Sequence, residues 1–339
     1  MSSARYALTE LKKFNNFVID NSRLRDIFVL NDYDFLHIYQ ALIFFDFKNF
    51  YENNKINTPP IARGVVNLNF PAAAKIIFAF MVSLLSFVFL ILSRRQVLIY
   101  SGEKINSLYK GDFRASGLYR HLFENKIRFV EILHTTFGPD FYLNFFKRKR
   151  PVIYLESLDI FYKIARKFKK LSDYDEMIGT INSDMLVDKQ FNRGLLVKYL
   201  CLINKSKLRI KILKRILSLS AAKIMIGSFS TRYTFELIEA GNLAKIKTFF
   251  FQAGALSKYD IGHTVNKSLK GKIIKPAKFF VESNYWKKEL FRLGTYFNES
   301  EIEVGGNIKQ DFTPEEAPLP QGENNKEINI LIPYEINIS

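Results

Sequence analysis

The chain has 339 residues, of which 48% are hydrophobic, so it is long enough for two domains and apolar enough to build their cores, which excludes wholesale disorder. Its single cysteine, Cys201, excludes a disulfide framework and a cysteine-based zinc site, and a small buried hydrophobe is the simplest interpretation of it. The formal net charge of +17 makes the surface attractive to anions such as phosphate groups, an anionic membrane face or nucleic acid.

Residues 1–70 are expected to form a helical N-terminal region, in which 36–53 is the strongest aromatic amphipathic stretch. Residues 71–95 are predicted as a hydrophobic membrane-associated helix. The apolar block 72–92 is interrupted only by Lys75 and two serines, and about 20 apolar residues cross a hydrocarbon core of about 30 Å. It is not a signal peptide, because residues 1–70 precede it. A single membrane span, a helix docked on the membrane face and a helix packed inside the domain all remain open, since Lys and Arg occur on both sides.

From residue 96 the chain alternates short apolar runs with longer amphipathic ones. Strands are predicted at 97–103, 128–134, 151–157, 222–228, 246–252, 277–283 and 301–307, and helices at 158–171, 204–217, 230–242 and 284–294. Strands that alternate with helices form a parallel sheet covered on both faces. Residues 96–308 are therefore predicted as one Rossmann-like α/β domain.

The composition changes after this domain. Residues 309–327 are polar and rich in Pro and Glu, which is typical of a linker. Residues 328–339 return to a buried-strand pattern, and a lone strand cannot make a domain. We therefore expect them to be the first strand of a second, truncated sheet domain.

The candidate site lies in the loops that follow the predicted strands. In open parallel sheets, ligands bind outside the carboxyl ends of the strands. Glycine there lets backbone amides approach phosphate or sugar, and Gln252 and His263 have side chains that can bind a ligand or transfer a proton. The residues at such ends are Ser228, Gln252, Gly254, Gly262, His263, Glu282, Gly305, Gly306 and Asn307.

Other functional patterns are weaker. His37, His121 and His134 lack the spacing of metal ligands, and two Asp-x-Asp pairs (32–34 and 173–175) border predicted helices, where Asp serves as a cap. No metal site is expected. The basic clusters at 147–150, 163–170 and 204–217 accompany no recognised nucleic-acid module, so nucleic acid is not expected as a partner. In 204–217 the apolar residues share one helical face, and the basic residues, Arg209 among them, cover the rest.

The segment 222–334 resembles bacterial GT-B-type glycosyltransferases of surface and capsular polysaccharide synthesis, related in pattern to CDP-glycerol glycerophosphotransferase-like enzymes of teichoic-acid synthesis. The resemblance rests on "IKTFFFQAG", "KFFVES", "NYWKKELFRLG" and "EIEVGGN". The family's loop reads Gln-His-Gly, whereas this chain has Ala253 between Gln252 and Gly254. Either His263 replaces the missing histidine as the catalytic base, or the chain binds without chemistry.

The resemblance implies a function. It implies a Rossmann-like domain of GT-B type that transfers a sugar or polyol phosphate from a nucleotide donor to a lipid-linked or polysaccharide acceptor. It also implies that no metal or cofactor takes part. The donor binds mostly to the family's second domain, so this chain alone is not expected to turn over. The expected location is the cytoplasmic face of the bacterial inner membrane, on an anionic lipid surface. The alternative is a non-catalytic, membrane-associated polysaccharide-assembly or binding protein.

Overall fold

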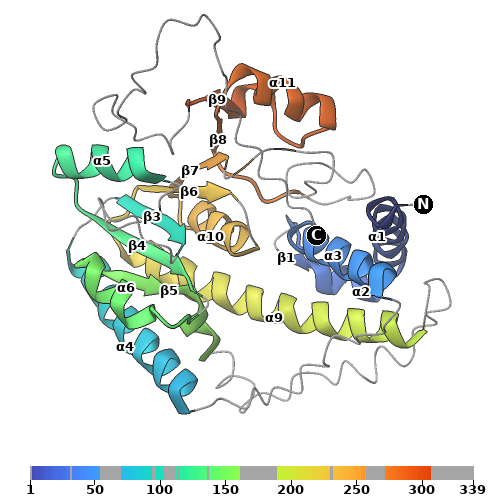
Figure 1. Cartoon of the computed structure of the whole chain (residues 1–339), viewed down its shortest axis with the longest axis horizontal. Coiled ribbons are helices and arrows are strands. Elements are labelled where there is room, and N and C mark those ends of the chain that lie inside the picture. Colours follow the sequence, from blue (N-terminus) through green and yellow to red (C-terminus); the bar gives the residue numbers. More distant parts are fainter. Residues whose placement is uncertain are drawn as a thin grey trace, which may run out of the picture.

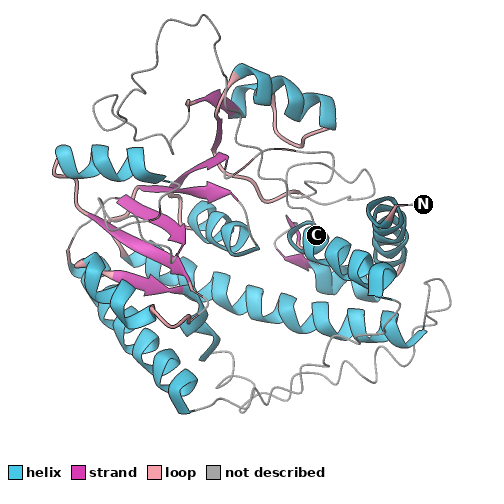
Figure 2. Cartoon of the chain, viewed as in Figure 1, coloured by secondary structure: helices cyan, strands magenta, loops and turns pink. Residues whose placement is uncertain are grey.

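The computed structural model describes residues 2–30, 33–53, 70–93, 97–102, 112, 115–135, 137–160, 189–229, 232–252, 254, 256 and 272–306. This part is an α/β fold built on a seven-stranded sheet with helices on both faces and a further group of helices from the N-terminus (Figures 1 and 2). The α/β class and the parallel sheet expected from the sequence are confirmed. The predicted linker 309–327 and the predicted strand 328–339 lie outside the described residues.

All seven strands of the large sheet are parallel, in the order β5-β4-β3-β6-β7-β8-β9. The chain therefore starts in the middle, moves outward to β5, crosses back to β6 and moves outward again to β9. Their bounds are β3 (Val97–Gly102), β4 (Phe129–His134), β5 (Val152–Tyr154), β6 (Ile224–Phe229), β7 (Lys247–Gln252), β8 (Lys278–Val281) and β9 (Ile302–Val304). In such doubly wound sheets the order reverses at a switch point, here between β3 and β6.

Strict alternation of apolar side chains builds a core on each face of the sheet. On one face, Leu98, Val130 and Met225 join the main hydrophobic cluster, which contains side chains of α9 (Lys189–Leu219) and α10 (Arg232–Leu243). On the other face, Ile99 and Phe129 pack with α5 (Ser116–Glu124). α11 (Asn284–Leu293) packs against β8 and β9, and its cap Gly294 is left-handed, with φ +84°.

The N-terminal region contains the expected helices, α1 (Ser3–Asp20), α2 (Ser22–Phe28) and α3 (Leu36–Asn53), and a short antiparallel pair, β1 (Val29–Leu30) and β2 (Tyr33–Asp34), that the sequence did not predict. Figure 1 shows α9 running from the sheet to these helices. Polar contacts tie α9 to them: Lys198 pairs with Asp46 at 2.6 Å, and the Tyr39 hydroxyl donates to the Leu202 carbonyl at 3.0 Å. Both groups of helices therefore share one core.

The basic segment predicted at 204–217 is the second half of the longer helix α9. Ile210, Leu213 and Leu217 are buried, and Lys211 is exposed, as an amphipathic helix requires. Arg209 departs from the expectation of a solvated basic face, because it is only 1% exposed. The reason is an acidic partner on the neighbouring helix, Glu236, at 2.8 Å.

The apolar segment forms helix α4 (Phe70–Leu92), which is long and apolar enough to cross a membrane by length and composition. It lies along the outer edge of the sheet, beside β5 and near α6 (Phe141–Arg148) (Figure 1). Phe78 of α4 packs against the aromatic rings of α6. The predicted hydrophobic helix is thus confirmed as a helix and is attached to the α/β fold.

Candidate functional site

The carboxyl ends of the strands lie in one row because their register is parallel. Gly102 of β3 pairs with His134 of β4, and Phe229 of β6 pairs with Gln252 of β7. This edge is where open α/β sheets bind ligands, at the point where the strand order reverses. The side chains along this row are therefore the candidates for a site.

His134 and Glu156 form a dyad at this edge. His134 ends β4, and Glu156 lies in the short 3-10 helix η2 (Leu155–Leu158), directly after β5. The imidazole Nδ1 hydrogen-bonds Oε1 of Glu156, while the backbone N–H of Thr135 donates to Oε2 of the same carboxylate at 3.2 Å. The carboxylate is thus held at both oxygens and in turn orients the imidazole.

The dyad is partly exposed. The His134 side chain is 34% exposed and that of Glu156 is 14% exposed. Within the described part of the chain, Nε2 of His134 has no hydrogen-bond partner. A histidine whose Nδ1–H is bound by a carboxylate presents the lone pair of Nε2, which is the arrangement of a general base with its orienting group.

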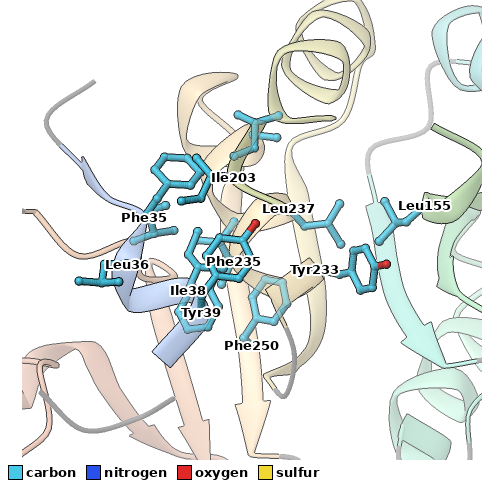
Figure 3. Close-up of a cluster of buried hydrophobic side chains, with 14 of the residues drawn as sticks. Phe35, Leu36, Ile38, Tyr39, Leu155, Ile203, Tyr233, Phe235, Leu237 and Phe250 are labelled. Atoms are coloured by element: carbon cyan, nitrogen blue, oxygen red, sulfur yellow. The ribbon is translucent and has the colours of Figure 1, made fainter. Parts of the chain in front are cut away.

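Tyr233 connects the dyad to the helix that follows β6. Its ring lies 4.7 Å from the imidazole of His134, centroid to centroid, and the guanidinium of Arg209 lies 4.7 Å from the same tyrosine ring. Arg209 is held by a buried ion pair with Glu236 at 2.8 Å and by a partly exposed one with Asp159 at 3.2 Å. Figure 3 shows Tyr233 on the side of the core that faces Leu155 of η2. The Tyr233 ring therefore links α10, which follows β6, to the His134 side chain at the end of β4.

Gly102, beside His134, has its backbone held at both polar groups. Its N–H donates to the Asp112 carboxylate at 2.7 Å, and its carbonyl accepts from the Arg148 guanidinium at 2.8 Å. Arg148 also pairs with Glu131, a fully buried carboxylate on the α5 face, at 3.3 Å. Burial, and then the charge of Glu131, raise the pKa of Tyr119, which donates to that carboxylate, well above its usual value. This ionic cluster is structural and stiffens the end of β3.

Gly227 lies under the switch point, where β3 and β6 meet. It pairs with Tyr100, and a Cβ at residue 227 would stand 2.7 Å from the Tyr100 Cβ. Only glycine therefore leaves room for the Tyr100 side chain on the paired strand. The two central strands are therefore closely packed at the switch point.

Gln252, predicted to bind the acceptor, has its amide engaged by the backbone. It is 2% exposed, its Nε2 donates to the Gly254 carbonyl at 2.7 Å, and its Oε1 accepts from the Glu282 N–H at 3.3 Å. The residue thus joins the ends of β7 and β8, a holding role that the sequence did not indicate. Gly254 is exposed, with nothing within 4 Å of the position of a Cβ.

The other predicted positions are spread along the edge. Ser228 is buried and pairs with Phe251, which packs on the α5 face, so its side chain points away from the face of His134. Gly305 packs against Phe280, and Gly306 has φ +74°, which favours glycine. Gly262, His263 and Asn307, together with Ala253, lie outside the described residues.

The sequence reasoning missed His134 and Glu156 because it considered His134 only as a possible metal ligand. His134 ends the apolar run "RFVEILH" and Glu156 is the second-last residue of "PVIYLES", so both are polar residues at the edge where ligands bind. That signal was present, but the pairing of the two strands was not. Among the described residues no group of three or more His, Cys, Asp or Glu side chains could hold a metal ion.

A cavity lies at the opposite edge of the sheet. This cavity of about 540 Å³ is lined by Tyr33, Asn242, Lys272, Lys275 and Glu301 among others, near the amino ends of β8 and β9. Lys275 and Glu301 neutralise each other at 2.7 Å. The cavity therefore offers space but no oriented reactive group.

Comparison of the chain with protein-family models, with curated proteins and with solved structures found no match in any of the three.

Proposed function

We propose that the chain is a group-transfer protein of the GT-B type, which moves a sugar or a polyol phosphate from a nucleotide donor to a hydroxyl of a membrane-linked acceptor. The observation that carries the proposal is the His134–Glu156 dyad at the carboxyl edge of a doubly wound sheet, next to the switch point. A transferase of this kind needs a base for the acceptor hydroxyl, and a carboxylate-oriented imidazole supplies one.

In this mechanism, Nε2 of His134 takes the proton of the acceptor hydroxyl as its oxygen attacks the donor. The new bond forms to the anomeric carbon of a sugar, or to phosphorus in a polyol phosphate. The bond from that atom to the nucleotide's phosphate oxygen breaks, and the nucleoside diphosphate or monophosphate leaves with the electron pair. Glu156 stabilises the imidazolium that forms.

The dyad changes the assignment of the base within the proposal. The sequence favoured His263, whereas His134 already has an orienting carboxylate and a side chain that is 34% exposed. Gln252 and Glu282 then hold the neighbouring loop rather than react. The non-catalytic alternative predicts that donor and membrane bind without release of nucleotide.

The test is nucleotide release from UDP-, GDP- and CDP-activated sugars and CDP-activated polyols, with bacterial lipid extract as the source of acceptor. We expect His134→Ala to lower turnover by about 10²–10⁴-fold, the usual contribution of a general base. His121→Ala is the matched control, because His121 is exposed on α5 and, among the described residues, hydrogen-bonds Asn125 one turn away. If turnover is lost in His263→Ala but not in His134→Ala, the general base is His263 and the assignment to His134 is wrong. Donor binding by the wild type without any release would favour the alternative.

A further inference from the structure

Helix α4 carries two opposite stripes of side chains. The inner stripe is buried and consists of Ala79, Ser83, Ser86, Phe87 and Leu90. The outer stripe is apolar and 37–75% exposed, and it consists of Ile77, Met81, Leu84, Leu85, Val88, Phe89 and Leu92. Members of each stripe are three or four residues apart, so each runs along one side of the helix for most of its length.

The inner stripe attaches α4 to the sheet by hydrogen bonds. β5 is an edge strand, and its outward N–H groups at Val152 and Tyr154 donate to the hydroxyls of Ser86 and Ser83 at 3.1 and 2.9 Å. At the other end of the contact, Lys75 donates to the Phe137 and Gly138 carbonyls, at 2.7 Å for the latter. A helix that left the sheet to cross a bilayer would leave these backbone groups without partners.

The outer stripe continues onto α6 and has a basic rim. Phe146 of α6 is 64% exposed, and its ring lies 6.4 Å from that of Phe78 in α4. Lys147 and Lys149, next to it in the chain, are exposed. Exposed apolar surface of this extent marks an interaction site, and an apolar face rimmed by lysines fits the boundary between headgroups and acyl chains.

We propose that α4 lies in the plane of an anionic membrane, with its outer stripe in the lipid and Lys147 and Lys149 at the headgroups. Charge decides the occupant. Two copies of a chain of net charge +17 would bring two basic rims together, whereas an anionic bilayer neutralises them. The helix is thus monotopic, held flat by the serines that bind β5.

This docking brings the candidate site to the lipid surface. Ser157 donates to the Ser83 hydroxyl of α4 at 3.0 Å, and it directly follows Glu156 of the dyad. The acceptor that reaches His134 is then an amphiphile drawn from the bilayer. This last step rests on the proposed function, while the docking itself does not.

Vesicle sedimentation tests the docking without any turnover. The wild type should sediment with phosphatidylglycerol-containing vesicles and more weakly with pure phosphatidylcholine. Met81→Glu should weaken partitioning at least tenfold. Phe45→Glu, on α3, is the matched control, since Phe45 is 53% and Met81 51% exposed. His134→Ala should bind vesicles as the wild type does, so failure of the catalytic assignment is separable from failure of docking.

Depth measurements separate a flat helix from a spanning one. Fluorescent labels on Ile77→Cys, Leu85→Cys and Leu92→Cys, in a Cys201→Ser background, should be quenched at one shallow depth. A spanning helix would instead place residue 85 deepest, because eight residues rise about 12 Å, and that result would overturn the proposal. Absence of vesicle binding would also overturn the proposal. So would a wild-type dimer that the Met81→Glu substitution converts to monomers, because the outer stripe would then be a dimer interface.

Discussion

Glu239 is a buried carboxylate that has no counter-charge among the described residues. It is 0% exposed on α10, and within the described residues neither of its oxygens has a hydrogen-bond partner. One turn earlier, Glu236 is matched by Arg209. Burial raises the pKa of Glu239 from 4.5 to about 7. We therefore expect this single group to make the stability of the protein depend on pH.

The sign and size follow from the two pKa values. Between pH 4.5 and 7 the unfolded state has lost this proton while the folded state keeps it, so the free energy of unfolding falls as the pH rises. One pH unit is worth about 1.4 kcal/mol, so the full loss is about 3 kcal/mol and is complete above about pH 7. Glu239→Gln cannot ionise and removes this loss.

Urea unfolding of the wild type and of Glu239→Gln, at pH values from 4.5 to 8.5, measures the effect. The free energy of unfolding of the variant, relative to the wild type, should rise by about 3 kcal/mol across this range. Burial of the amide in Glu239→Gln adds a term that is the same at every pH and so does not affect this rise. Glu124→Gln is the control, because the Glu124 side chain is 66% exposed on α5, and its profile should follow the wild type. An advantage that stays constant with pH would show that Glu239 is ionised in the folded state and would refute the reasoning.

Two further changes test the packing around the site. Gly227→Ala should destabilise the fold by about 1–3 kcal/mol, because the new Cβ would stand 2.7 Å from the Cβ of Tyr100. Gly254→Ala is the control and should be nearly neutral in the same urea-unfolding assay, because a Cβ there meets nothing within 4 Å. Equal effects of the two substitutions would contradict the close contact of β3 and β6. Arg209→Met should cost about 3–5 kcal/mol by leaving Glu236 buried without its cation, and a cost below about 1 kcal/mol would mean that the ion pair is not formed as described.

The sequence by itself determined the class of the fold and the position of its strands. Alternation of apolar residues has a period of two in a strand, so Leu98 and Ile99 must face opposite sides wherever the sheet lies, and each side then needs its own helices. The apolar run of α4 likewise required a helix away from water. These are local properties, which neighbouring residues decide among themselves.

Only the tertiary structure decided which distant residues meet. Strand order and parallel register place Glu156 beside His134, although 22 positions separate them in the chain. The same is true of Ser83, whose hydroxyl binds a strand 71 positions away and so turns an apolar segment into an edge cover with one free face. The sequence predicted Arg209 as a surface charge, whereas in the structure α10 places Glu236 against it and both are buried. A hydrogen bond or an ion pair depends on two groups that the fold brings together, and the sequence around either group does not identify its partner.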